Sequence, residues 1–358
     1  MKDQNKQKGS TAKTRSGTKK KLSCEKHSNH AGNSKKSKTP LTYEKWVSSA
    51  ISGGVKGIRR EYVDSVRSYA PVGSQKAWNS EKNCIKNRYD DIRLLDKTRV
   101  VLKDTPDNND YINASYVIAG DTTFICTQGP MENTIQDFWI MSVQEQVKVI
   151  LQLCKYNENG REQCAEYFKD EETWVKYGSV RVRTLEKSIN VAHLKKVTRT
   201  LLQVEYKGKR IEVTHILYAG WPDQSVAEST SICREVRRLV LGLSQQKPVI
   251  VHCSAGVGRT GTFVTLEMAI SLLKKKEFVP MVEIAKRVRN QRIGAIQNDQ
   301  QYLFIYRMIL EILIYEDLLS RTEQIVNFIK DYNDLIRRKC NERARKFMKK
   351  SKEKAIAS

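Results

Sequence analysis

Residues 248–263, PVIVHCSAGVGRTGTF, place a cysteine and an arginine around a run of small side chains. Small residues leave room for backbone N–H groups to turn inward and form an anion-binding nest. A helix that begins near Arg259 would aim its positive end at the same point. Such a site stabilises a thiolate at Cys253, and the arginine can hold two oxygens of a phosphate group. The residues expected to line the nest are Ser254, Ala255, Gly256, Val257 and Gly258.

The composition is that of a large folded domain without an apolar segment for membranes or export. The chain has 358 residues, 39% of them hydrophobic, and no run of about 18 apolar residues. Its first residues lack the apolar stretch of a secretory signal. Eight cysteines stand at irregular spacings, which is typical of reduced thiols. We therefore expect a monomeric protein that is found in the cytoplasm and in part in the nucleus.

Much of the net charge of +24 lies at the two ends of the chain. Residues 1–40 hold twelve Lys and Arg against two acids, and residues 337–358 hold ten against two. We predict a disordered basic tail over 1–40, a folded domain over 41–336 and a basic tail over 337–358 that extends a helix. Both tails suit contact with polyanions, either nucleic acid or an anionic membrane, and neither should be needed for catalysis.

One possible metal site falls within the first tail. Cys24, His27 and His30 are three potential ligands, but a structural zinc site needs four and no fourth lies nearby. We therefore expect no zinc at these three residues, and we expect the protein to need no cofactor.

Strand-like and helix-like patterns follow one another between the tails. Strands cluster early and helices late, which favours a single α+β domain built around a mixed sheet flanked by helices. The expected strands cover 98–102, 111–118, 123–128, 147–153, 179–185, 199–206 and 210–218. The expected helices cover one or two segments of 42–69, then 134–146, 228–246, 260–276, 281–292 and 299–319.

Turnover of a phosphoryl group on cysteine needs a proton donor and a positioned water molecule. GWPDQSV, residues 220–226, offers Asp223 as the acid on a segment that can move as a lid, with Trp221 as its anchor. An aspartate after proline is otherwise an ordinary turn residue. Gln297, in GAIQNDQQ, offers an amide that can position water.

Six motifs in order make the chain resemble the tyrosine-specific protein phosphatases over about residues 57–318. They are KNRYDDI (86–92), NDYINASYV (109–117), TQGPMENTIQDFW (127–139), WPD (221–223), HCSAGVGRTG (252–261) and QNDQQYLF (297–304). The resemblance implies one catalytic domain with a twisted mixed sheet and no metal. It implies hydrolysis of phosphotyrosine in proteins through a cysteinyl-phosphate intermediate.

The resemblance also implies a role for each matching residue. Cys253 resembles the nucleophile and Arg259 the phosphate clamp. Thr260 resembles the hydroxyl that helps the thiolate leave, and His252 the residue that tunes it. Asp223 resembles the general acid of the lid.

The remaining matches concern water and substrate. Gln297 resembles the amide that positions water, with Gln301 beside it. Tyr89 resembles the ring that stacks on phosphotyrosine and makes a pocket too deep for phosphoserine. Asp91 resembles the carboxylate that holds the peptide backbone.

The chain departs from the family's usual pattern at five positions, one of which is Val143 in place of a tryptophan after Trp139. Ser225 and Ala227 replace the glycine and second proline of the lid, and Asp90 stands where some relatives carry a basic residue. Counting without gaps from Trp139 puts Gln144 where relatives have a glutamate that pairs with the loop arginine. A neutral amide supplies no charge, so this count predicts a slow enzyme that Gln144→Glu would improve.

Two other function classes remain open from sequence. The first is a module that binds phosphotyrosine without hydrolysing it, which the intact set of catalytic residues disfavours. The second is an RNA 5′-triphosphatase, since a similar Cys-x5-Arg loop serves that reaction and the basic tails suit RNA. Tyr89 and the Trp-Pro-Asp segment disfavour it.

Overall fold

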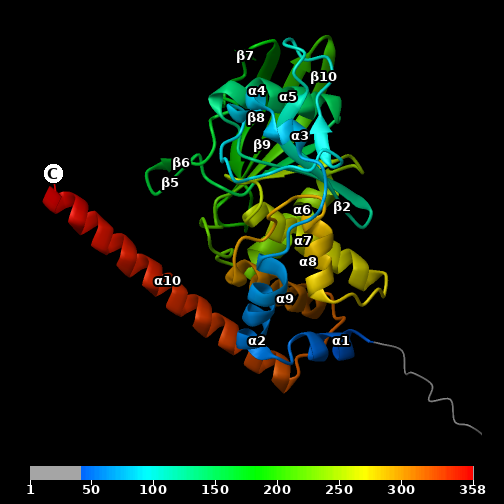
Figure 1. Ribbon diagram of the computed structural model, residues 1–358, viewed down its shortest axis with the longest axis vertical. Coiled ribbons are helices and arrows are strands. Elements are labelled where there is room, and N and C mark those ends of the chain that lie inside the picture. The colour runs from blue at the N-terminus through cyan, green and yellow to red at the C-terminus, as the bar shows by residue number, and fades with distance from the viewer. Residues whose placement is uncertain (1–41, 358) are drawn as a thin grey trace, which may run out of the picture. The chain divides into compact units, whose positions relative to one another are not determined.

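A nine-stranded mixed sheet forms the centre of the computed structural model, which describes residues 42–357 (Figure 1). The predicted tail over 1–40, with Cys24, His27 and His30, lies outside the described residues. The strand order is β1 (Arg99–Val101), β2 (Tyr111–Ala119), β3 (Thr122–Thr127), β11 (Val249–His252), β4 (Val149–Gln152), β10 (Lys209–Tyr218), β9 (Val197–Tyr206), β8 (Val180–Asn190) and β7 (Val175–Tyr177).

The central strands are parallel and the outer strands are antiparallel. β11 lies between β3 and β4 and is parallel to both, with Val251 opposite Cys126 and Leu151. Every residue of β11 is buried, as expected of a parallel strand covered on both faces. The short apolar run before Cys253 is therefore a central strand, and its carboxyl end delivers the cysteine to the edge of the sheet. Such an edge is where ligands bind in open α/β sheets.

Helices cover both faces of the sheet. Figure 1 shows α6–α9 gathered on one side of the sheet, and α5 lies on the other. The helical segments are α1 (Tyr43–Ala50), α2 (Gly54–Glu61), the π-helical turn η1 (Tyr62–Arg67), α3 (Lys76–Asn79), α4 (Glu81–Cys84), the 3-10 turn η2 (Glu132–Thr134), α5 (Ile135–Gln144), α6 (Thr230–Leu243), α7 (Arg259–Lys274), α8 (Met281–Arg289), α9 (Asp299–Tyr315) and α10 (Glu323–Ala357).

Polar caps decide where two of the helices near the site begin. Ser229 accepts a hydrogen bond from the N–H of Ile232 at 3.3 Å and starts α6. Asn298 accepts one from the N–H of Gln301 at 2.9 Å and starts α9. Each cap satisfies a backbone donor that the first helical turn leaves free. The second cap fixes the loop that carries Gln297 directly before it.

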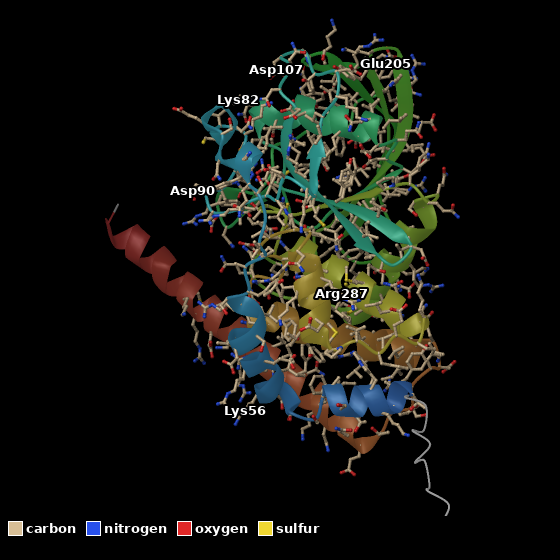
Figure 2. The ribbon with its side chains drawn as sticks, turned by 45° about the vertical axis from the view of Figure 1, so that its right-hand side comes forward. Lys56, Lys82, Asp90, Asp107, Glu205 and Arg287 are labelled. Atoms are coloured by element: carbon tan, nitrogen blue, oxygen red, sulfur yellow. The ribbon has the colours of Figure 1, made fainter. Side chains whose placement is uncertain are left out.

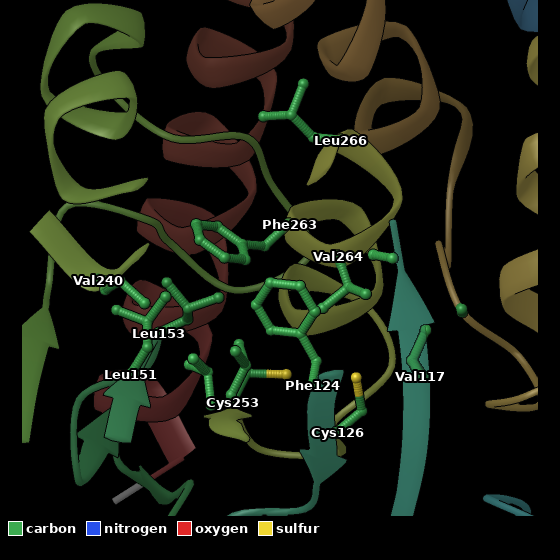
Figure 3. Packing of buried hydrophobic residues seen from close by; sticks show 14 of the residues in the cluster. Val117, Phe124, Cys126, Leu151, Leu153, Val240, Cys253, Phe263, Val264 and Leu266 are labelled. Carbon is green, nitrogen blue, oxygen red and sulfur yellow. The ribbon is translucent and has the colours of Figure 1, made fainter. Parts of the chain in front are cut away.

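The hydrophobic core runs between the central strands and α7. Figure 3 shows Phe124 and Phe263 packed beside each other, with Leu151 on β4 and Cys253 at the border of the core. The two phenylalanine rings meet edge to face with centroids 6.3 Å apart. Cys253 is 3% exposed. The core therefore forms the rear wall against which the cysteine is held.

The prediction of an α+β domain around a mixed sheet is confirmed. The predicted strands and helices all have counterparts. The central strand β11, the first part of α10, β7, α3, α4 and the separate ribbon of β5 (Asn157–Glu158) and β6 (Arg161–Glu162) were not predicted. The predicted boundary at residue 336 falls inside α10, which continues as one helix to Ala357. Over residues 42–357, no helix combines the length and the apolar character that a membrane span requires.

Candidate active site

The loop after β11 turns its carbonyl groups away from its centre. The carbonyl of Ser254 accepts a hydrogen bond from Gly129 N at 2.8 Å, and that of Val257 accepts one from Ile296 N at 2.9 Å. In a trans peptide the N–H points opposite to the carbonyl of the same unit. The N–H groups of the loop therefore face its centre, next to the first turn of α7, which is the nest that the small residues predict.

Arg292 supports this loop from behind, a role that no sequence motif predicted. Its Nε donates to the carbonyl of Gly256 and its Nη2 to that of Ala255, each at 3.1 Å. The side chain is fully buried, and burial lowers its pKa. Gly256 itself has φ of +69°, and a Cβ there would lie 2.2 Å from the carbonyl oxygen of Thr127. Arginine and glycine together hold the loop in its anion-binding form.

The guanidinium of Arg259 lies beside the loop and donates hydrogen bonds to three acceptors. Its Nη1 donates to Glu158 Oε1 at 2.7 Å and to the carbonyl of Trp221 at 3.0 Å. Its Nη2 donates to Asp223 Oδ1 at 3.2 Å. Burial opposes its charge, but the acidic groups around it, led by Cys253, raise the pKa of Arg259 above its usual value. The guanidinium is thus a fixed, permanent cation beside the thiol.

The partner of Arg259 shows that the interpretation of Gln144 was wrong. Gln144, at the end of α5, accepts from Lys103 N at 2.8 Å and donates to the carbonyl of Val101 at 3.0 Å. It therefore faces β1 and the loop after it. The carboxylate comes instead from Glu158 in the β5–β6 ribbon. Counting without gaps along α5 could not reveal a residue that a later hairpin brings to the arginine.

The lid segment, residues 220–226, rests over the loop. The indole of Trp221 is 1% exposed, packs edge to face on Phe304 and donates to the carbonyl of Ser225 at 2.9 Å. These contacts anchor the segment while the Asp223 side chain stays 37% exposed. The structure thus brings the predicted acid to the same guanidinium that borders Cys253.

Gln297 and Gln301 lie on the other side of the loop. A Cβ built on Gly258 would be 2.3 Å from Gln297 Oε1 and 3.1 Å from Gln301 Nε2, so both amides touch this glycine. Gln301 Oε1 also accepts from Gln297 N at 2.9 Å. Among the described residues, Thr260 Oγ1 and Gln301 Nε2 are buried without a hydrogen-bond partner. Buried polar groups of this kind are costly unless a ligand or water meets them.

His252 ends β11 and lies behind the cysteine. Its Nδ1 is 3.3 Å from the carbonyl oxygen of Cys253, and its Nε2 is 2.9 Å from the hydroxyl of Tyr167. Burial lowers the pKa of His252 to about 3, so the ring is neutral at ordinary pH. The histidine thus orients the backbone of Cys253 without adding a charge.

Tyr89 forms the outer wall of the site. Its hydroxyl lies 2.8 Å from Ser254 Oγ, so the ring stands over the loop. Asp91 is exposed, and Figure 2 shows Asp90 at the outer edge of the same segment. Arg88 fixes this segment by donating to the carbonyl of Pro130 at 2.7 Å. An aromatic ring beside the nest suits a ligand that joins a flat group to an anion.

The predicted site residues thus come from four separate segments that the fold brings to one edge of the sheet. Two supporting residues, Glu158 and Arg292, were missed. The string GREQCAEY that follows Glu158 has no periodic pattern, and Arg292 comes after two other arginines, Arg287 and Arg289, in a short basic stretch. Between residues 42 and 357, no three His, Cys, Asp or Glu side chains gather as a metal site.

Comparisons with known proteins agree on one family. The model of the family described as protein-tyrosine phosphatase matches residues 83–311. The human tyrosine-protein phosphatase non-receptor type 9 is 33% identical over 306 residues, which cover 80% of this chain and 51% of that protein. The protein-tyrosine-phosphatase PTP1 of Arabidopsis thaliana is 36% identical over 265 residues, covering 70% of this chain and 76% of that protein.

A mouse relative, tyrosine-protein phosphatase non-receptor type 18, is 35% identical over 264 residues, 71% of this chain and 56% of that protein. The chain spans about half the length of the type 9 relatives it matches. The family model covers well over half of the chain and includes both Cys253 and Asp223. The chain belongs to the protein-tyrosine phosphatase family.

Proposed function

We propose that this protein hydrolyses phosphotyrosine in proteins through a cysteinyl-phosphate intermediate. The observation that carries the proposal is the convergence of Cys253, Arg259 and Asp223 around one anion nest. A thiol nucleophile, a fixed cation and a carboxyl group are the three parts that phosphoryl transfer to sulfur requires.

In the first half-reaction the phosphate binds to the inward N–H groups of the loop and to the Arg259 guanidinium. The Cys253 thiolate attacks phosphorus, so that an S–P bond forms as the P–O bond to tyrosine breaks. Asp223, as the carboxylic acid, donates its proton to the leaving phenolate oxygen. Trp221 holds the lid segment in place through its ring contact with Phe304, and its hydrogen bond to the Ser225 carbonyl fixes the turn within the segment.

In the second half-reaction water attacks phosphorus and the S–P bond breaks, which releases inorganic phosphate and restores the thiolate. Asp223, now a carboxylate, accepts the proton of that water. Gln297 orients the water beside Gly258, and Gln301 holds the Gln297 backbone. The Thr260 hydroxyl, without a partner among the described residues, is free to donate to the departing sulfur.

Selectivity for tyrosine follows from the depth of the site. Cys253 is 3% exposed, whereas Tyr89 is 38% exposed at the rim. A phosphate must cross this depth to reach sulfur, and an aryl ring between Tyr89 and the lid spans it. Phosphoserine is shorter and would hold its phosphorus away from the thiolate. Asp91 is exposed beside Tyr89, and in this proposal its carboxylate accepts hydrogen bonds from the backbone of the substrate peptide.

A side-by-side assay tests the proposed function. Release of phosphate from a phosphotyrosyl peptide is compared with release from the phosphoseryl peptide and from RNA that ends in a 5′-triphosphate. We expect turnover of the phosphotyrosyl peptide alone. Tight binding without turnover would support the binding module, and faster turnover of the RNA would support the triphosphatase.

Replacing Glu158 by glutamine tests the support of Arg259. The amide keeps an acceptor but removes the charge, and a charge-assisted hydrogen bond is about twice as strong as a neutral one. We therefore expect the transition state to lose about 1.4 kcal/mol of stabilisation, which corresponds to roughly a tenfold fall in kcat/KM for the phosphotyrosyl peptide. Gln144→Glu is the matched control and should change kcat/KM by less than about twofold. A gain for Gln144→Glu, or no loss for Glu158→Gln, would contradict this assignment.

A further inference from the structure

The long helix α10 reaches the lid after its apolar contacts with the domain have ended. Its buried apolar face consists of Ile325, Phe328, Tyr332 and Leu335. Arg343 lies eight residues beyond Leu335, about 12 Å further along the axis. Arg343 is only half-buried, although Glu342 and Ala344 on either side are exposed. Something other than apolar packing therefore holds this side chain against the domain.

The Arg343 guanidinium bridges two parts of the active site. Its Nη1 donates to Ser225 Oγ in the lid, and its Nη2 donates to Gln300 Oε1 at 2.5 Å. Ser225 is 3% exposed, so the lid hydroxyl is enclosed by this contact. Gln300 lies in the first turn of α9, next to Gln301. The Arg343 guanidinium thus joins the lid to the start of α9, where Gln297 and Gln301 lie.

Within residues 42–357, the lid is also joined to α9 by the Trp221–Phe304 ring contact and by one hydrogen bond to the residue that caps this helix. Asn298 Nδ2 donates to the carbonyl of Gln224 at 3.3 Å, which is a long hydrogen bond. Gln224 has φ of +49°, a conformation that non-glycine residues adopt only when their surroundings hold them there. Ser225 also stands where the lid of the resembling family usually has glycine, which could not receive a side-chain contact. The serine hydroxyl is what allows the arginine to act on the lid.

We infer that Arg343 is a positioning residue for the general acid. It favours the lid conformation in which Asp223, two residues before Ser225, lies against Arg259. The inference rests on the proposed function, because it concerns the acid of that reaction. Arg343 touches neither substrate nor the reacting atoms and acts through Ser225. It also revises the expectation that residues 337–358 are dispensable for catalysis.

The test compares Arg343→Ala with Arg345→Ala, which removes the same charge from an exposed position two residues away. Because Arg343 is partly exposed, we expect Arg343→Ala to lower kcat for the phosphotyrosyl peptide by roughly three- to tenfold. Ser225→Ala should cause a similar loss, and the double variant should lose no more than either alone. Truncation after residue 336 should reproduce the loss. Arg345→Ala should match the unaltered protein.

A second readout separates positioning from a general structural role. An aryl phosphate whose phenol is strongly acidic needs little help from a general acid, so its kcat should hardly change in Arg343→Ala. In the Asp223→Ala background, Arg343→Ala should cause no further loss. The thermal midpoint of Arg343→Ala should stay close to that of Arg345→Ala.

Three results would overturn the inference. The first is equal activity of Arg343→Ala and Arg345→Ala on the phosphotyrosyl peptide. The second is an equal loss on both classes of leaving group, which would indicate a structural effect. The third is faster turnover in Arg343→Ala, which would make the contact inhibitory. Failure of the proposed function is distinct, because the unaltered protein would then not hydrolyse phosphotyrosine at all.

Discussion

Cys253→Ser should abolish hydrolysis of a phosphotyrosyl peptide, with kcat falling by about 10⁵-fold or more, the scale on which enzymes lose activity without their nucleophile. A serine hydroxyl is far less acidic than a cysteine thiol, so at this position it remains protonated and is a poor nucleophile. The N–H groups of the loop and Arg259 are unchanged, so binding should persist. The measurement is single-turnover phosphate release together with the Kd of the phosphopeptide, which should stay within a few-fold of the value for the unaltered protein.

Cys84→Ser provides the matched control, because it makes the same chemical change at an exposed cysteine on α4. This variant should keep full turnover. Substantial hydrolysis by Cys253→Ser would show that sulfur is not the nucleophile. Loss of both turnover and peptide binding in a folded Cys253→Ser would instead place the cysteine in the binding site alone.

The sheet was predictable from sequence because its strands carry apolar and β-branched runs. β2, β3, β9 and β10 lie within two residues of their predicted bounds. The strands that were missed are short: the central strand β11 has four residues, β7 has three, and β5 and β6 have two each. Two-residue strands carry no periodicity to detect. Their pairing depends on a turn and on neighbours distant in the chain.

The same limit explains which parts of the site escaped prediction. Cys253 and Arg259 lie in one local segment whose small residues have a direct physical meaning. Glu158 and Arg292 act only through contacts made across the fold, 101 residues from Arg259 and 36 residues from Gly256 respectively. Nothing adjacent to either residue in sequence indicates these partners. The erroneous role given to Gln144 arose from the same cause, since spacing along a helix was used to assign a contact made by a hairpin.

The C-terminal helix α10 shows that charge alone does not predict which basic residue makes a specific contact. A run of basic residues is most often a solvated face of a helix. In α10 the side chains of Arg337, Arg338, Arg345 and Lys346 are indeed exposed. The side chain of Arg343 is different only because the lid lies within its reach. Charge alone could not distinguish it from Arg345, which has the same charge two residues later.

Asp223→Ala should lower kcat for the phosphotyrosyl peptide by about two to four orders of magnitude, the usual contribution of a general acid. The Asp223 carboxyl lies 3.2 Å from Arg259 Nη2, on the lid beside the nest that holds the phosphate. Without it the tyrosine phenolate must leave unprotonated. The thiolate and the phosphate contacts remain, so KM should change much less than kcat. Steady-state kinetics on the phosphopeptide separate the two.

The effect of Asp223→Ala on kcat should depend on how acidic the leaving phenol is. This dependence distinguishes the loss of a general acid from the loss of a structural contact. An aryl phosphate with a strongly acidic phenol leaves readily as the anion, so Asp223→Ala should slow its first half-reaction far less than that of phosphotyrosine. Asp121→Ala, at an exposed turn between β2 and β3, removes the same side chain and should leave both substrates unaffected. An equal loss on both substrates would mean that Asp223 positions Arg259 through their ion pair and does not donate the proton. Because that pair is partly exposed, its own contribution should be small, and proton transfer should account for most of the loss.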